Sequence, residues 1–148
     1  MQYLLDTNIY GLSLLDSINK QKIHPNIHKF LGENDVNVIS RFVYSELLTL
    51  KTGFSLKNIR NDRLDLLIRK IRTEQLIVEF GEITTLILAQ LKSELLHTYN
   101  QRNRTVDLYI AAQCIENNLT LVTANRKDFE NVKGLKILNY DQANYKFS

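Results

Sequence analysis

The stretch that most constrains the fold is residues 3–8, in which a short apolar run stops abruptly at the carboxylate of Asp6. In a parallel sheet, a buried strand ends in this way before it passes into a loop and a helix. Open α/β folds bind their ligands at the carboxyl ends of such strands, so Asp6 is a candidate site residue. Thr7 and Asn8, like Asp6, are also good helix N-caps, and capping alone would explain all three.

The same alternation of short apolar runs and helical segments continues along the chain. Strands that alternate with helices imply a parallel sheet covered on both faces. We therefore predict one domain over residues 1–148 with a three-layer α/β/α fold and a central parallel sheet of about five short strands. The predicted strands are residues 3–5, 36–39, 76–80, 119–123 and 135–140. The predicted helices are residues 7–19, 26–33, 41–52, 59–73, 82–97, 105–117 and 126–132.

Several helix ends are marked by single residues. Ser40 is a suitable N-cap for the helix over residues 41–52, which Gly53 is expected to end. Thr105 is expected to start the helix that follows residues 98–104, and Asn118 is its expected C-cap.

Composition narrows the class of protein. The chain has 148 residues, of which 44% are hydrophobic and 24% charged, as in an ordinary soluble globular domain. Met1 leads straight into the first strand, and no apolar run approaches the ~18 residues of a membrane span, so we expect neither a signal peptide nor a membrane segment. Cys114 cannot form an internal disulfide, should pack as a small hydrophobic residue and fits a reducing cytoplasm. The three histidines, expected in loops or at the surface, are His24, His28 and His97.

Two further carboxylates lie on predicted helices. Glu46 falls in a row with Phe42 and Leu50, so it either faces partly inward, where a lone charge is costly, or sits at the edge with its head in solvent. Asp107 lies in the first turn of its helix, where the helix dipole favours an anion by about 0.3–1 kcal/mol. That dipole alone would account for an aspartate at this position.

A fourth polar position follows the strand over residues 119–123. Asn125 could cap the short helix after it, with Asp128 as the partner three residues later. The two side chains also offer one neutral and one charged oxygen to a site. Because all strand ends of a parallel sheet share one edge, Asp6 and Asn125 should meet there, beside Asp107 and Glu46. An oxygen-only set of this kind favours Mg²⁺ or Mn²⁺ over Zn²⁺.

These segments resemble those of the PIN-domain ribonucleases, in particular the VapC-type toxins of prokaryotic toxin–antitoxin pairs. They follow one another in the order of that family and cover the chain from end to end. One departure is Asn125, where many PIN nucleases carry an acid. The matching segments are residues 4–9, 38–40, 45–47, 106–112, 119–125 and 128–129.

The resemblance implies Mg²⁺- or Mn²⁺-dependent endonucleolytic cleavage of RNA. Asp6, Glu46 and Asp107 would hold the metal directly or through its waters, and Asn125 would complete the catalytic set. The family's sheet order would place the first and fourth strands side by side, with Asp6 and Asn125 flanking the point where the strand order reverses. The residues expected to support the site are Thr7, Asn8, Ser40, Thr123 and Asp128.

RNA cleavage also needs a basic surface. Residues 57–72 hold six Lys or Arg residues against two Asp residues, a net +4 in a chain whose formal net charge is +3. A solvated helix face would give the same pattern. The candidate RNA-binding residues are Arg60, Arg63, Arg69, Arg102 and Arg104.

The resemblance further implies a cognate antitoxin protein, a homodimer or larger toxin–antitoxin assembly, and a cytoplasmic location. Two other classes stay open. A receiver or phosphatase-like domain also places Asp at strand ends, but it would have paired acids early in the chain, which residues 6–8 lack. An inactive PIN fold that only binds RNA would not need Asp6, Glu46 and Asp107 intact.

Overall fold

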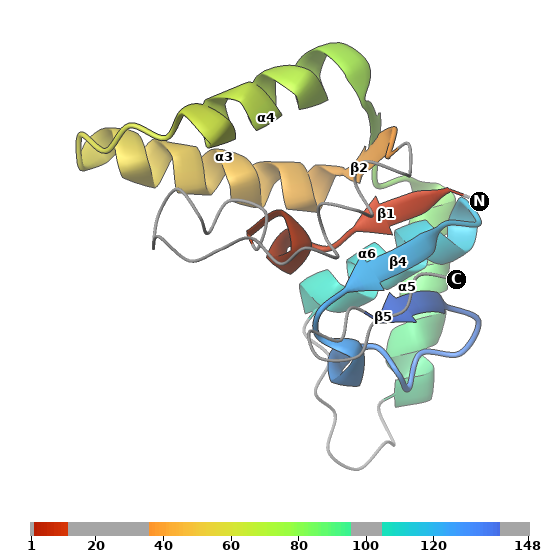
Figure 1. The fold of residues 1–148 in the computed structure, drawn as a ribbon. Helices are drawn as coiled ribbons and strands as arrows, with labels where there is room; N and C mark the ends of the chain where they lie inside the picture. The colour runs from red at the N-terminus through yellow and green to blue at the C-terminus, as the bar shows by residue number, and fades with distance from the viewer. Residues whose placement is uncertain (1, 12–35, 96–104, 140–148) are drawn as a thin grey trace.

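The computed structural model describes residues 2–11, 36–95 and 105–139 (Figure 1). Residues 7–11 are helical, which agrees with the start of the helix predicted over residues 7–19. The strands are β1 (Tyr3–Leu5), β2 (Val38–Ser40), β3 (Leu76–Val78), β4 (Thr120–Thr123) and β5 (Lys136–Asn139). The helices are α3 (Arg41–Leu56), α4 (Asp62–Glu74), α5 (Glu82–Leu95), α6 (Thr105–Glu116) and the short 3₁₀ helix η1 (Arg126–Asp128).

All strand pairs in these ranges are parallel, and they form two sheets. The first has the order β1-β4-β5, with Leu4 opposite Leu121, and the second pairs β2 with β3. The pairing of the first and fourth strands, which the resemblance implied, is confirmed. The strands predicted as one sheet are divided because β1 and β2 touch without a hydrogen-bonded ladder. Strands of three residues offer few main-chain groups to such a ladder.

The helices lie on different sides of these strands. Figure 1 shows α6 behind the β1-β4-β5 sheet, where it contacts β4, and α5 packs along α6. The two helices α3 and α4 pack against each other beside β2. The interior of α6 is almost wholly buried, from Leu108 to Cys114 with the exception of the half-buried Tyr109. This helix is therefore the centre of the core, and it carries Asp107 at its start.

Local caps explain where α3 begins and ends. The Ser40 hydroxyl accepts a hydrogen bond from the Phe42 amide at 3.2 Å, so the predicted N-cap is confirmed. The prediction that Gly53 ends the helix is wrong, because α3 continues to Leu56. A glycine inside a helix costs only about 1 kcal/mol, and Phe54 packs against the core one residue later. Asn58, with φ of 54°, adopts the left-handed conformation beyond the end of the helix.

Other helix boundaries follow the same logic. Helix α4 begins at Asp62 rather than near residue 59, because the Asn61 side chain accepts a hydrogen bond from the Leu64 amide at 3.0 Å. Asn118 has φ of 53° and ends α6 as predicted. The last predicted helix is reduced to η1.

Some predictions fall outside the described residues. These are the helix over residues 26–33, the three histidines, and both Arg102 and Arg104. Within residues 2–11, 36–95 and 105–139, no helix is long and apolar enough to cross a membrane.

Candidate metal and active site

Asp6 lies directly after β1, at the carboxyl end of the sheet, and its side chain is only 8% exposed. Its backbone amide continues the β1–β4 pairing by donating to the Val122 carbonyl at 2.9 Å. One carboxylate oxygen accepts the amide of Thr7, the first residue of the helix that begins there, at 2.8 Å. The other accepts the Thr123 hydroxyl at 2.9 Å and the Asn8 amide group at 3.2 Å. Asp6 therefore lies at the sheet edge and directly before a helix, with its carboxylate held by three hydrogen bonds.

The loops after β1 and β4 are joined by side chains. Asn8 accepts a hydrogen bond from the Ala124 amide at 3.2 Å. The Thr123 hydroxyl, which is fully buried, also accepts the Asn125 amide at 3.0 Å. Asn8 and Thr123 thus join the two loops and orient the Asp6 carboxylate.

The electrostatic environment of Asp6 is unfavourable to its charge. Burial raises the pKa of the Asp6 carboxyl above its ordinary value of 3.8, and the hydrogen bonds from Thr123 and Thr7 oppose that rise. The negative charges of Asp107 and Glu46 raise the same pKa further. Asp107 and Glu46 are therefore each near enough to Asp6 for their charges to act on its carboxylate.

Glu46 reaches this site from the second turn of α3. Its side chain is exposed, so the expectation that it faces partly inward is wrong and the alternative, a head in solvent, holds. Its carboxylate nevertheless accepts a hydrogen bond from the Thr7 hydroxyl. Thr7 thereby connects the loop after β1 to the helix that carries Glu46.

Asp107 is half-buried in the first turn of α6. The helix dipole stabilises its charge there, while its charge acts on Asp6. Among the residues that the structure describes, no three His, Cys, Asp or Glu side chains are arranged to hold one metal ion. The acids share a region without forming a ready-made chelate.

The chemistry of the donors still suits a divalent ion. Asp6, Glu46 and Asp107 offer only oxygen, which Mg²⁺ and Mn²⁺ prefer, and Mg²⁺ keeps several waters when bound. An ionised carboxylate has about four acceptor positions. Asp6 uses three of them, on Thr7, Asn8 and Thr123, so its carboxylate keeps capacity for a further partner.

The residues after β4 depart from the predicted capping pair. The Asn125 side chain makes no cap hydrogen bond to η1 and is exposed, so its predicted capping role is wrong. Asn125 is connected to the site through its backbone amide, which bonds to Thr123. Asp128 is half-buried at the end of η1.

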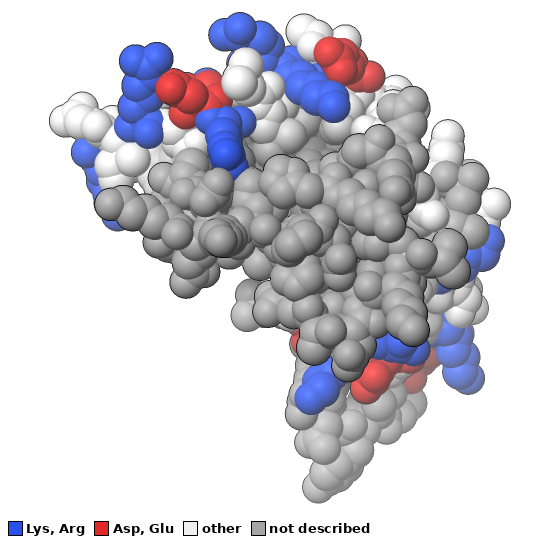
Figure 2. Space-filling model, viewed as in Figure 1, with Lys and Arg blue, Asp and Glu red and all other residues white. Residues whose placement is uncertain are grey.

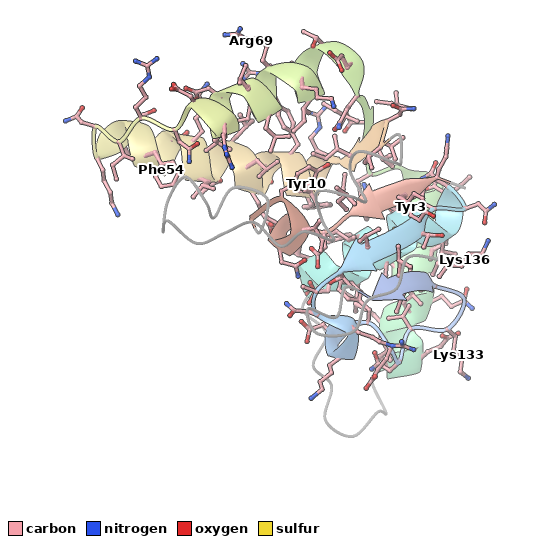
Figure 3. The ribbon with its side chains drawn as sticks, viewed as in Figure 1. Tyr3, Tyr10, Phe54, Arg69, Lys133 and Lys136 are labelled. Carbon is pink, nitrogen blue, oxygen red and sulfur yellow. The ribbon has the colours of Figure 1, made fainter. Side chains whose placement is uncertain are left out.

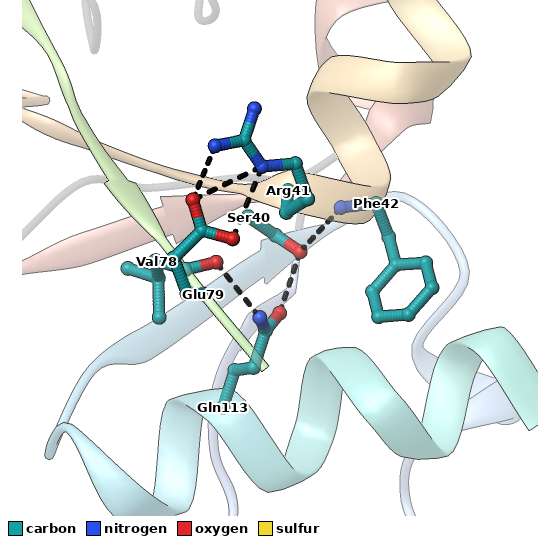
Figure 4. A network of polar contacts seen from close by, with 6 residues as sticks. All are labelled: Ser40, Arg41, Phe42, Val78, Glu79 and Gln113. Atoms are coloured by element: carbon teal, nitrogen blue, oxygen red, sulfur yellow. Dashed lines mark hydrogen bonds and ion pairs between the residues drawn. The ribbon is translucent and has the colours of Figure 1, made fainter. Parts of the chain in front are cut away.

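Ser40 belongs to a polar network with Gln113 and Val78. Its hydroxyl is fully buried and donates to the Gln113 side chain at 2.5 Å, and the Gln113 amide group donates to the Val78 carbonyl at 2.9 Å (Figure 4). Arg41 and Glu79, the residues after the neighbouring strands, form an exposed ion pair beside this network. Sequence reasoning overlooked Gln113, although a glutamine between Ala112 and Cys114 in an apolar helix is a visible signal.

The predicted basic surface covers α4 and the turn before it. Figure 2 shows blue Lys and Arg side chains interspersed with red acidic ones along this part of the molecule. Arg60 is paired with Asp62 at 2.7 Å, and both are exposed, so this pair adds little stability. Arg69 projects from α4 away from α3 (Figure 3) and forms no ion pair with a described residue.

A pocket of about 350 Å³ lies where α3 meets α4. Its net charge is positive, since three cations outnumber one acid. Lys51 is 3.5 Å from Asp65, and Arg72 donates to the Tyr44 hydroxyl at 2.8 Å. Figure 1 shows α3 between α4 and β1. The lining residues are Lys51, Asp65, Ile68, Arg69, Arg72 and Thr73.

Comparison with solved structures identifies similar folds. The crystal structure of VapBC2 from Rickettsia felis, bound to a DNA fragment from their promoter, matches with a TM-score of 0.69 and 27% identity, covering 95% of this chain and 100% of that chain. The structure of VapBC-1 from nontypeable Haemophilus influenzae matches with a TM-score of 0.67 and 25% identity, covering 94% and 98%.

Comparison of sequences agrees with the structural matches. The chain is 30% identical over 149 residues to ribonuclease VapC2 of Rickettsia felis, covering 96% of this chain and 100% of that relative. Residues 3–135 match the PIN domain, a range that begins at β1 and contains all three carboxylates. This chain belongs to the PIN domain family.

Proposed function

We propose that this protein is a divalent-metal-dependent endoribonuclease, the toxin of a type II toxin–antitoxin pair, built as one PIN domain over residues 1–148. The observation that carries the proposal is the environment of Asp6. A buried carboxylate at the carboxyl end of β1 is oriented by three hydrogen bonds and lies within reach of the charges of Glu46 and Asp107. Such an arrangement of acids is costly to the fold, and a bound cation offsets the cost.

Asp6, Glu46 and Asp107 would hold Mg²⁺ or Mn²⁺ directly or through water. When bound, the ion supplies positive charge that polarises the scissile phosphate and lowers the pKa of the attacking water. Thr123 and Asn8 keep the Asp6 carboxylate in one orientation, and Thr7 does the same for Glu46. Asn125, whose backbone amide bonds to Thr123, would offer a neutral side-chain oxygen to the site.

The RNA substrate needs cationic contacts beyond the site. Arg60, Arg63 and Arg69 provide them from α4 and the turn before it, and Arg102 and Arg104, which precede Asp107 in sequence, are assigned to the scissile end. We further propose a cytoplasmic location and assembly with a cognate antitoxin as a homodimer or larger complex. The names of the relatives, ribonuclease VapC2 and the VapBC assemblies, support this choice.

The test is cleavage of RNA by the purified protein. We expect cleavage with Mg²⁺ or Mn²⁺, none with excess EDTA, and products with 5′-phosphates, because a water molecule attacks in line. Asp6→Asn, Glu46→Gln and Asp107→Asn should each nearly abolish cleavage, whereas Asp128→Asn should be milder.

Asp65→Asn is a matched control, since it removes an acid from α4 away from the site. Cleavage that persists in EDTA, or products with 2′,3′-cyclic phosphates, would contradict the mechanism. Equal losses in Asp65→Asn and Asp107→Asn would contradict the assignment of the site.

A further inference from the structure

Gln113 is a fully buried polar residue in the middle of an otherwise apolar helix. Both ends of its amide are satisfied by protein groups. The carbonyl oxygen accepts the Ser40 hydroxyl at 2.5 Å, and the amide nitrogen donates to the Val78 carbonyl at 2.9 Å. Figure 4 shows Gln113 reaching from α6 to the ends of β2 and β3.

The position of Gln113 connects the two helices that carry acids. Asp107 lies in the first turn of α6, fewer than two turns before Gln113 on the same helix. Ser40 directly precedes α3 and caps it by accepting the Phe42 amide, and α3 carries Glu46. One buried hydrogen bond, Ser40 to Gln113, therefore ties the start of α3 to α6.

Apolar packing alone would not fix the position of α3 relative to α6. The side chains of α6 that surround Gln113 are alanine, cysteine and isoleucine, which tolerate small shifts of one element along another. A buried amide tolerates none, because a displaced donor or acceptor has no water to replace its partner. An apolar side chain would fill the same space, so the glutamine adds geometric definition rather than volume.

We propose that Gln113 is a positioning residue, which through Ser40 and Val78 sets the placement of α6 relative to α3 and so the separation of Asp107 from Glu46. This separation determines how tightly the acids bind a divalent ion, a consequence that rests on the proposed function. The side-chain hydrogen bonds of Gln113 go to Ser40 and Val78, so we infer that it acts through the two helices.

The first measurement is the distance between the helices. Spin labels at Thr52→Cys and Thr105→Cys, both exposed in the wild type, report the separation of α3 from α6, while the buried Cys114 stays unlabelled. We expect one narrow distance distribution in the parent protein. Gln113→Met, which keeps the volume of the side chain and removes both hydrogen bonds, should shift or broaden that distribution.

The second measurement is Mn²⁺ affinity, followed by the rise in melting temperature during titration. Loss of a partner that orients metal ligands typically weakens metal binding by about 10–100-fold, and we expect a change of about tenfold or more in Gln113→Met. Ser40→Ala should act in the same direction, and Ser40→Thr, which keeps a hydroxyl, should restore much of the affinity.

Thr84→Val is the matched control for a mere loss of stability. Thr84 is fully buried, accepts the Gly81 amide at the start of α5 and donates to Glu116 of α6, so its loss also breaks buried hydrogen bonds to α6. It lies on the α5 side and should lower the melting temperature without changing the α3–α6 distance or the Mn²⁺ affinity.

An unchanged distance distribution in both Gln113→Met and Ser40→Ala would overturn the proposal, as would equal effects in Thr84→Val. A parent protein that binds no Mn²⁺ and cleaves no RNA would refute the proposed function instead. In that case the spin-label distances still decide whether Gln113 positions the helices.

Discussion

Replacing Thr123 by valine removes one hydroxyl from the carboxylate site and nearly keeps the shape of the side chain. Thr123 is fully buried and donates to Asp6 at 2.9 Å. A hydrogen bond to an ionised group contributes about 1.5–3 kcal/mol, so the metal-free variant should lose about that much free energy of unfolding at neutral pH. For a chain of this size each kcal/mol corresponds to about 2–4 °C, which predicts a melting temperature lower by roughly 3–12 °C.

The loss should depend on pH in a defined direction. The pKa of Asp6 is already raised in the folded protein, and the Thr123 hydroxyl works against that rise. A carboxyl group whose pKa is higher in the folded than in the unfolded protein stabilises the fold at pH values below its unfolded-state pKa. This stabilisation is lost as the pH rises through the folded-state pKa. Removing the hydroxyl raises the pKa of Asp6 further. The difference in the free energy of unfolding between Thr123→Val and wild type should therefore be largest at neutral pH. It should shrink as the pH falls through the pKa of Asp6 in the folded protein.

Thermal melts in EDTA at neutral and acid pH measure this effect. Thr120→Val is the matched control, because Thr120 lies buried on the same strand and its hydroxyl has no hydrogen bond to another described residue. It should change stability little and without pH dependence. Equal losses in the two variants, or a Thr123→Val loss that stays constant with pH, would refute the reasoning.

Two other predictions concern the same core. Asp107→Asn removes a charge that raises the pKa of Asp6, so without metal at neutral pH this inactive variant should melt higher than wild type, by about 2–4 °C for each kcal/mol of repulsion relieved. Acid pH and excess Mg²⁺ should both narrow that difference in melting temperature. A variant less stable than wild type in EDTA would show that Asp107 only stabilises the start of its own helix. Burial raises the pKa of the Cys114 thiol above its ordinary range, so alkylation should be slow in the folded protein and fast in denaturant. Rapid labelling under native conditions would contradict its place in the core.

Much of the fold could be predicted because its signals are local. An apolar run that ends at Asp6 or Thr123 marks the end of a buried strand, and Ser40 and Asn118 mark helix ends through their own side chains or backbone. Gly53 misled the prediction, since its intrinsic cost is small and the packing of Phe54 outweighs it.

The details of the site depend on contacts between residues far apart in the sequence, which the spacing of residues along the chain does not reveal. Glu46 shares a helical row with apolar residues, yet its head lies in solvent and meets Thr7, a partner 39 residues away. The link from Gln113 to Ser40 spans 73 residues and depends on how α6 meets two strands. The division of the strands into two sheets likewise depends on the contact between β1 and β2, which neither strand reveals alone.

The pairing of β1 with β4 also dictates when the site can form during synthesis. Asp6 and its partner Thr123 are 117 residues apart, and closing a loop of that length costs roughly 4 kcal/mol of chain entropy or more. At about 5–20 residues per second, a ribosome needs roughly 6–25 s to add the intervening residues. A nascent chain that stops short of β4 has its first strand and first carboxylate but lacks the strand that pairs with β1 and the Thr123 hydroxyl that orients Asp6. The site that Asp6 and Thr123 form together is therefore withheld from every chain that stops short of β4.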